Sequence, residues 1–458
     1  MNKKTLKVSK PNAEIDKNDR KSFLENTVAP CSHDEQQIRK QVSIRMMEAV
    51  VDASNLTSAL KRVKSNKGSA GVDNMTTEEL ENYLNLHLES IKKQLLSGTY
   101  QPSAVKRVEI PKPDGGVRKL GIPTVLDRFI QQAVGQVLNQ IYDSKFSESS
   151  FGFRPRRSAQ DAIRQSKRYV EEGYRIVVDI DLEKFFDKVQ HDELMNILKC
   201  QIKDARLLKL IRRYLKAGIM INNEVIEPTE GTPQGGPLSP LLSNIILDKL
   251  DKELEERGHK FCRYADDCNV YVKTKRSGER VKTSLTKFIS DKLKLKVNED
   301  KSAVAHVSRR KFLGYTFNLR QKAKVQIKPH GKSVEKFKLK VKALMRAGRG
   351  RNIKRFIKED LNPLLRGWYE YFKVSDVKRI FRDLEEWIRR RIRNIYWRQL
   401  KSGKTRFKEM INCGIKPERA KECAGNGRGP WWNSNKLHMS ELMPTKSLKE
   451  MGLYCFAK

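Results

Sequence analysis

Several features that are common in other proteins are missing from this chain of 458 residues. Its seven cysteines form no Cys-x-x-Cys pair, and their odd number and wide scatter argue against a disulfide framework and for a reducing compartment. No run approaches 18 apolar residues, and the first ten residues, "MNKKTLKVSK", lack the apolar segment of a secretory signal. We therefore expect a soluble cytoplasmic protein that has no membrane partner.

Acidic residues are scarce relative to basic ones. The chain holds 94 Lys and Arg against 55 Asp and Glu, a formal net charge of +39. This excess goes beyond what solubility requires and implies a polyanionic partner, held through its phosphates by counterion release. The shortage is most severe in residues 301–458, where 41 basic residues face 13 acidic ones and all five tryptophans lie. We therefore predict nucleic-acid contacts in this last third of the chain.

The hydrophobic pattern divides the chain into parts. Residues 1–38 are polar without a hydrophobic period, which predicts a flexible tail. Between 39 and 328, short apolar strands mix with helical stretches, and "AVKRVEIPKPDGGVRKLGIPT" (104–124) reads as a strand, a tight turn and a second strand. This mixture predicts an α+β domain built on an antiparallel sheet. Residues 329–405 follow a helical period, and 406–458 form a basic end segment.

The stretch "RYADDCNVYVK" (263–273) predicts a β-hairpin with Asp266 and Asp267 at its tip. Aspartate is common in turns, so the pair alone indicates only a solvated turn. However, Asp181 ends the apolar strand "RIVVDID" (175–181), where an unpaired charge is costly. If the three carboxylates converge, Mg²⁺ would relieve their repulsion, and two such ions could support an in-line phosphoryl displacement.

Two further segments could bind phosphates near such a site. Lys112 and Arg118 lie on the two arms of the "PDGG" turn, from which both could reach one triphosphate. The loop "TPQGG" (232–236) allows a ligand to approach the backbone closely, and Gln234 could contact a template or a nucleotide. Ordinary surface charge for the first pair and a plain helix-entry turn for the loop remain open alternatives.

Five ordered blocks carry a family resemblance: "DIDLEKFFD", "GTPQGGPLSPLLSNIILDKLD", "RYADDCNVYV", "LKLKVNEDKS" and "KFLGYTF". They resemble the palm motifs of reverse transcriptases, and the residues within these motifs are similar to those of bacterial group II intron-encoded proteins. "LNPLLRGWYEYF" resembles the thumb, or maturase, domain of that family, and "GRGPWW" its C-terminal DNA-binding segment. The resemblance implies a right-hand polymerase fold: fingers and palm in 39–328, a helical thumb or maturase domain in 329–405 and a DNA-binding segment in 406–458.

The resemblance also implies roles for single residues. Two catalytic Mg²⁺ ions would be bound by Asp181, Asp266 and Asp267, with Leu182 included in the metal set. Phe186 would exclude a ribose 2′-hydroxyl, although simple core packing is the alternative for this side chain. Nucleotide contacts would come from Lys112, Arg118, Gln234 and Lys301, the last assisting the pyrophosphate leaving group. Within the basic stretch "RRRIRNIYWR" (389–398), nucleic-acid contacts would come from Arg389, Arg390, Arg391, Arg393, Trp397 and Arg398.

The function implied is that of an RNA-directed DNA polymerase that is also a maturase. Its partners would be its group II intron RNA, an RNA template with a DNA primer, target DNA and dNTPs, and it would be associated with the bacterial nucleoid when on DNA. The end segment shows no cysteine pair or histidine cluster, and its single His438 is expected at the surface. These features resemble the class C lineage without a DNA endonuclease, in which synthesis would be target-primed or primed by a nascent strand.

Two alternatives stay open at this point. A reverse transcriptase recruited for host defence or DNA repair would show the same motifs. A splicing cofactor without polymerase activity is disfavoured, because it should have lost some of the three carboxylates, and all three are present.

Overall fold

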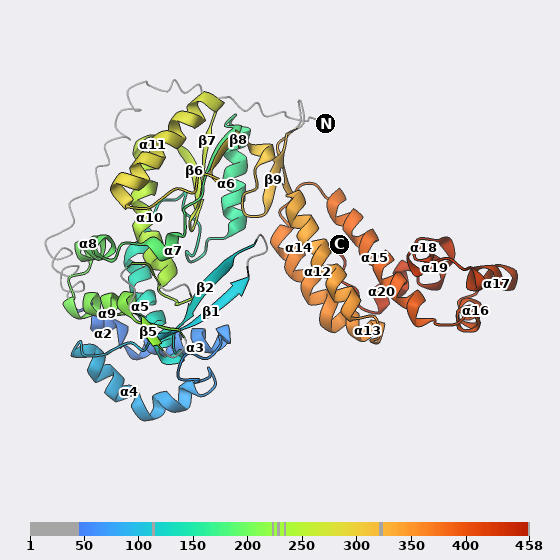
Figure 1. Cartoon of the computed structure of the whole chain (residues 1–458), viewed down its shortest axis with the longest axis horizontal. Coiled ribbons are helices and arrows are strands. Elements are labelled where there is room, and N and C mark those ends of the chain that lie inside the picture. The colour runs from blue at the N-terminus through green and yellow to red at the C-terminus, as the bar shows by residue number, and fades with distance from the viewer. Residues whose placement is uncertain are drawn as a thin grey trace, which may run out of the picture.

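The computed structural model describes residues 45–111, 115–221, 224–226, 230–232, 235–319 and 324–456. Figure 1 shows three regions in succession: a largely helical region that holds the N-terminal described residues, a region around a central sheet, and an arm of helices that ends the chain. None of the described helices is both long and apolar enough to cross a membrane.

The central sheet has four antiparallel strands in the order β6-β7-β3-β8. Their bounds are β3 (Ile176–Ile180), β6 (Lys260–Tyr264), β7 (Asp267–Val272) and β8 (Ala303–His306). The middle strands are mostly apolar, because helices α6 (Ala159–Glu171), α10 (Ser239–Glu256) and α11 (Lys275–Leu293) cover the sheet. The antiparallel sheet predicted from the sequence is confirmed.

A second sheet has the strand order β2-β1-β4-β5. The bounds are β1 (Val105–Pro111), β2 (Val117–Ile122), β4 (Ile219–Ile221) and β5 (Glu224–Ile226). Strands β1 and β2 pair antiparallel, which confirms the predicted strand, turn and strand, whereas β1 and β4 pair parallel. A third pair, β9 (Tyr315–Asn318) with β10 (Gln326–Pro329), leads into the helical arm.

The remaining helices of the first two regions are α2 (Met46–Val50), α3 (Ala53–Asn66), α4 (Leu80–Leu96), α5 (Val125–Tyr142), α7 (Phe185–Lys188), α8 (His191–Gln201) and α9 (Ala205–Lys216), with 3-10 turns η1 (Asp143–Lys145) and η2 (Val307–Arg309). Helix α9 shows why they form. Asp204 caps its N-terminus, and its apolar residues recur every three or four positions on one buried face.

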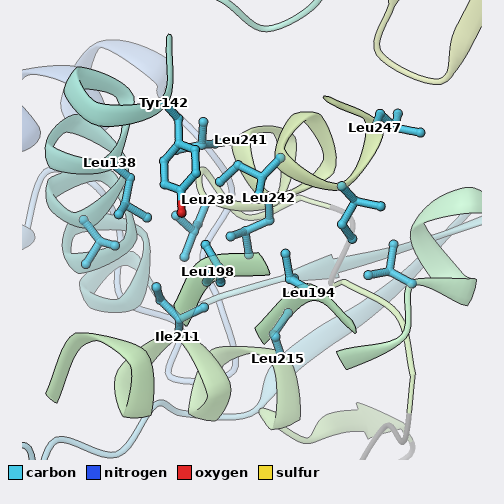
Figure 2. Packing of buried hydrophobic residues seen from close by; sticks show 14 of the residues in the cluster. Leu138, Tyr142, Leu194, Leu198, Ile211, Leu215, Leu238, Leu241, Leu242 and Leu247 are labelled. Carbon is cyan, nitrogen blue, oxygen red and sulfur yellow. The ribbon is translucent and has the colours of Figure 1, made fainter. Parts of the chain in front are cut away.

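One hydrophobic core joins these helices to the central sheet. Figure 2 shows Leu138 of α5, Leu198 of α8, Ile211 of α9 and Leu242 of α10 converging on a shared interior. Each fully buried leucine contributes on the order of 2 kcal/mol to folding. The sheet that carries the candidate site therefore rests on a rigid support.

The arm contains α12 (Gly331–Ala347), α13 (Ile353–Phe356), the π-helical turn η3 (Ile357–Leu361), α14 (Asn362–Phe372), α15 (Arg379–Gln399), α16 (Gly403–Asn412), α17 (Pro417–Gly425), α18 (Pro430–Asn433), α19 (Leu437–Leu442) and α20 (Thr445–Glu450). Helix α15 has two buried faces. One belongs to an aromatic-rich core with α12 and α14, and the other to a small core with α16, α17 and α19. The boundary predicted between residues 405 and 406 falls inside the continuous helix α16.

Candidate active site

The two aspartates of "YADD" lie at the tip of the β6–β7 hairpin. Tyr264 pairs with Asp267, so only Ala265 and Asp266 form the loop. Ala265 has a φ of 57°, and Asp266 is not among the residues with positive φ. A two-residue loop with positive φ at its first position matches the φ pattern of a type II′ hairpin, where glycine is usual. An alanine there is strained, and such strain is typical of functional turns.

Strand register brings Asp181 to this tip. In the antiparallel pair of β3 and β7, Ile180 lies opposite Cys268. One step further along both chains, Asp181 lies opposite Asp267. Asp181 and Asp266 are 85 residues apart in the sequence, and the sheet brings them to the same end.

Electrostatics show that the carboxylates are close together. Burial, together with repulsion from Asp266, Asp179 and Asp181, raises the pKa of Asp267 to about 7. The side chain of Asp267 is nevertheless open to solvent, so water screens part of this repulsion. The repulsion that the sequence suggested is thus a property of the fold, and it favours a cation at this place.

The donor set fits a hard divalent cation only in part. Across the described ranges, no cluster of three or more Asp, Glu, His or Cys is arranged to hold a metal ion by itself. Mg²⁺ commonly binds through one or two carboxylates and completes its shell with water and substrate phosphates. Leu182 and Val297 form an isolated antiparallel β-bridge in which the hydrogen bonds are made by the neighbouring residues on each side. The backbone carbonyl of Leu182 therefore points away from Val297. That carbonyl is a further possible oxygen ligand.

The segment that carries Lys301 is tied to Asp181. The backbone N–H of Asn298 donates to the carbonyl of Asp181 (2.8 Å), and the N–H of Asp181 donates to Oγ of Ser302 (3.0 Å). Lys301 is exposed beside these contacts. Its carbonyl accepts a hydrogen bond from Nη2 of Arg310 (2.8 Å). The structure thus brings Lys301 to the neighbourhood of the carboxylates, while its role in the reaction stays a prediction.

Arg310 was not identified from the sequence. Its guanidinium forms an ion pair with Asp179, with Nε donating over 2.9 Å, while it also holds the Lys301 carbonyl. Asp179 shares a face of β3 with Asp181 because side chains alternate along a strand. Burial raises the pKa of Asp179, and the Arg310 guanidinium opposes that shift. The available signal in the sequence was its partner Asp179, an ionisable residue on an apolar strand two positions before Asp181.

Phe186 and the glycine loop are packed together. Phe185 is buried in the core, whereas Phe186 is only half-buried and meets it edge-on, with ring centroids 5.3 Å apart. The N–H of Thr232 donates to the Phe186 carbonyl (2.6 Å), and a Cβ on Gly231 would come within 3.0 Å of that oxygen. Gly231, whose φ is 93°, therefore allows the loop to reach Phe186. This placement suits a sugar-contacting residue, and the sugar selection remains untested.

The phosphate-binding residues are described only in part. Arg118 is exposed near the turn end of the β1–β2 hairpin, where it pairs with Ile110. Lys112 and Gln234 lie outside the described residues, so their predicted nucleotide contacts stay predictions.

Most arginines in the basic stretch of α15 are half-buried against the segments that follow this helix. Arg390 stacks on Trp431, with its guanidinium carbon 3.8 Å from the ring centroid, and donates to the Trp431 carbonyl. Arg391 lies 4.5 Å from the same ring, and Nε of Arg393 donates to the Met443 carbonyl (3.0 Å). Arg389 is mostly buried beside Glu385. These arginines hold the last helices onto α15, and of the predicted set only Arg398 is exposed.

The expectation of a nucleic-acid contact from Trp397 is wrong. Its ring is 0% exposed and packs with Met410 and Met439 in the small core on the second face of α15. His438 was expected at the surface, but it is buried as well. It packs against Trp397 and hydrogen-bonds Asn433 through Nε2 (3.1 Å). Both errors have one cause: the last helices cover this face of α15.

Opposed aspartates at the end of an antiparallel sheet are the arrangement expected of a right-hand nucleic-acid polymerase. The family comparisons make the class specific. Residues 110–317 match the reverse transcriptase (RNA-dependent DNA polymerase) model, and residues 334–414 match the group II intron maturase-specific domain.

Curated relatives agree with these matches. The chain is 34% identical to Protein YkfC of Escherichia coli (strain K12) over 58% of this chain and 80% of that protein. It is 31% identical to the group II intron-encoded protein LtrA of Lactococcus lactis subsp. cremoris, over 58% of this chain and about half, 55%, of that protein. It is 34% identical to the putative COX1/OXI3 intron 2 protein of Saccharomyces cerevisiae, over 56% of this chain and 30% of that protein. The chain belongs to the group II intron-encoded reverse transcriptases, and it carries an RNA-directed DNA polymerase domain followed by a maturase-specific domain.

Proposed function

We propose that this chain binds the RNA of its own group II intron, stabilises the folded form of that RNA that can splice, and copies it into DNA during retrohoming. Synthesis would start from a primer in the target DNA or from a nascent strand. The observation that carries the polymerase part is the register that sets Asp181 opposite Asp267, beside Asp266. The maturase part rests on the matched domain and on the net charge of the last third of the chain.

In the proposed reaction, Asp181, Asp266 and Asp267 would hold two Mg²⁺ ions, and the Leu182 carbonyl would be an added oxygen ligand. The ions, when bound, stabilise the attacking primer oxygen and the leaving pyrophosphate. The raised pKa of Asp267 means that, without a cation, this carboxyl holds a proton at neutral pH part of the time. Asp267 would therefore have to lose that proton before its carboxylate could bind a cation.

The substrates are deoxynucleotides in this proposal. Phe186 would contact the nucleotide sugar from α7, where its ring meets Phe185 edge-on and its backbone carbonyl accepts a hydrogen bond from the Thr232 N–H. Phe186→Ala should raise ribonucleotide incorporation, measured as the ratio of kcat/KM for dNTP and rNTP in primer extension. An unchanged ratio would return Phe186 to a packing role.

The proposed setting is the bacterial cytoplasm, with the protein on the nucleoid when it acts on DNA. The six cysteines in the described part of the chain, from Cys200 to Cys455, are all free thiols. Free thiols suit a reducing compartment.

The deciding experiment is primer extension on an RNA template with Mg²⁺ and dNTPs. The wild type should extend the primer, and chelation of Mg²⁺ should stop it. Asp266→Ala should abolish extension while RNA binding persists. Asp291→Ala is the matched control, because Asp291 is an exposed aspartate on α11 that is not one of the three candidate metal ligands. Extension by Asp266→Ala at the wild-type rate would refute the site.

The maturase part needs a separate test. The group II ribozyme encoded around the gene should splice faster at low Mg²⁺ when the protein is added, and Asp266→Ala should help equally well. Absence of such a ribozyme around the gene would favour a reverse transcriptase recruited for another task.

A further inference from the structure

A fully buried arginine lies directly beneath the catalytic turn. Arg263 ends the apolar face of β6 and is 0% exposed. Its guanidinium forms an ion pair with Asp251 of α10, which is equally buried. A buried ion pair is weak evidence for stability, because apolar side chains of similar volume often fold as well or better. The pair therefore calls for another explanation.

All five N–H groups of this guanidinium are used. Nε and Nη2 donate to the two oxygens of Asp251 (2.7 and 2.5 Å), and Nη2 also donates to Oγ of Ser150 (2.8 Å). Nη1 donates to Oδ1 of Asn244 (2.9 Å) and to the carbonyl of Ala265 (3.0 Å). The last bond reaches the one loop residue with positive φ, directly before Asp266.

The segment 149–152 also contacts Arg263 and Ala265. The N–H of Phe151 donates to the Arg263 carbonyl, and the N–H of Arg263 donates to the Ser149 carbonyl (2.9 Å each). A Cβ on Gly152 would come within 2.2 Å of the Ala265 nitrogen, so only glycine permits this approach. The Gly152 carbonyl in turn accepts a hydrogen bond from Asn244 (2.8 Å). The turn is thus held between the loop around Gly152 and the guanidinium.

We propose that Arg263 is a positioning residue of the polymerase site, which fixes the left-handed Ala265 and so sets the direction of the Asp266 and Asp267 carboxylates. Asp251 and Asn244 orient the guanidinium from α10. Lysine cannot replace it, because one ammonium cannot span four groups arranged around a planar fork. This inference rests on the proposed function for its catalytic consequence, while its structural part stands on the contacts alone.

The matched control is Arg154, a second buried arginine nearby. It pairs with Asp143 (2.7 Å) and donates to the carbonyls of Ser147 and Ser150. None of the hydrogen bonds described for Arg154 reaches the turn. Arg154→Lys removes contacts to the loop before Gly152 but none to the turn itself, so it should lower the melting temperature of the protein while changing the turn less than Arg263→Lys does.

The test compares Arg263→Lys with Arg154→Lys in the full chain. In Arg263→Lys we expect kcat to fall about 10²-fold, since small misplacements of catalytic groups cost this much. The Mg²⁺ concentration for half-maximal extension should rise about tenfold, as when a group that supports a metal ligand is lost. KM for dNTP and RNA binding should stay unchanged. Amide hydrogen exchange in residues 264–268 should accelerate more in Arg263→Lys than in Arg154→Lys.

The hydrogen-exchange arm needs no polymerase activity, so it separates failure of this inference from failure of the proposed function. Wild-type exchange in the turn of a folded Arg263→Lys protein would overturn the positioning role, as would unchanged kcat and Mg²⁺ requirement. If Arg263→Lys does not fold, Asn244→Ala removes one orienting partner and leaves the ion pair. It should shift exchange and Mg²⁺ requirement in the same direction, and no shift in either would refute the inference.

Discussion

The central sheet β6-β7-β3-β8, here called the palm, and the C-terminal helices use charge in opposite ways. In the palm, Asp181, Asp266 and Asp267 are brought together although they repel, and backbone register holds them in place. In the C-terminal helices, arginines are drawn inward to tryptophan rings and backbone carbonyls, as with Arg390 on Trp431. The first arrangement costs stability and leaves a place for a cation. The second arrangement adds stability, and its arginines are already engaged in contacts within the protein.

The difference teaches that net charge does not map a binding surface. Cation–π contacts contribute about 0.5–2 kcal/mol each, depending on desolvation. Here Arg390, Arg391 and Arg406 each lie within 5 Å of a tryptophan ring centroid. Part of the excess positive charge of the last third therefore serves packing, and exposed residues such as Arg398 and Trp432 are the ones that we propose for nucleic-acid contact.

The largest effect on activity is expected from removing one of the three carboxylates of the palm. Asp181→Asn should lower kcat for primer extension by about 10³-fold, which is about 4 kcal/mol of transition-state stabilisation. The protein should remain folded, since the backbone bonds of Asp181 to Asn298 and Ser302 do not need its carboxylate. Steady-state extension together with circular dichroism checks both parts. Activity near the wild-type level would show that the charges in the palm are as dispensable as surface charge.

The second effect concerns the opposite region. Trp397→Ala should cost about 3–5 kcal/mol of unfolding free energy, because it empties the centre of the small core. Trp432→Ala is the control: its ring is 41% exposed, and its loss should change stability little. Denaturant unfolding measures both variants. A stable Trp397→Ala protein with weakened RNA binding would restore the surface role expected from the sequence.

These two cases show what could be predicted from sequence. The order of the motif blocks, together with the family resemblance, was sufficient to predict that the three aspartates meet at one end of the sheet. Their binding of metal stays a prediction. Trp397 could not be placed in this way. The apolar stripe of α15 through Phe381, Leu384 and Ile388 accounts for one buried face, and the second face is buried only by helices that come later in the chain.

Arg263 shows a different limit. Arg263 lies three residues before Asp266 in the sequence, but its partners Asp251, Asn244 and Ser150 come from two other segments. A charged residue on an apolar strand was the available signal. Which carboxylate would meet it depended on the packing of α10 against β6, and that packing has no local pattern in the sequence.

An intermediate effect is expected for the inward arginines. Arg390→Gln with Arg393→Gln should cost about 2 kcal/mol, because the carbonyls of Trp431 and Met443 lose charged donors. Limited proteolysis should then cut residues 400–456 sooner than in the wild type.

The exposed Arg398→Gln is the control for this pair. It should leave proteolysis unchanged and reduce the slope of log K for RNA against log salt by about one unit. The reverse pattern, with a reduced slope for the double variant and normal proteolysis, would mean that the inward arginines contact RNA after all.

The smallest effect is a pH dependence of the metal-free protein. The raised pKa of Asp267, about 7, means that the folded state binds this proton more tightly than the unfolded state does. Its contribution to stability is complete below the unfolded pKa near 4 and is lost as pH rises through 7. Because solvent screens the exposed carboxylate, we expect a loss of about 1 kcal/mol.

Asp267→Asn tests the sign of this dependence. Between pH 5 and pH 8, the melting temperature of Asp267→Asn should rise relative to the wild type by about 2 °C, whereas Asp291→Asn should show no such trend. Mg²⁺ should shrink the difference at pH 8, because the cation stabilises the charged wild-type site and the amide binds it less well. A pH-independent difference would mean that the palm carboxylates do not repel, and the contrast with the C-terminal helices would then disappear.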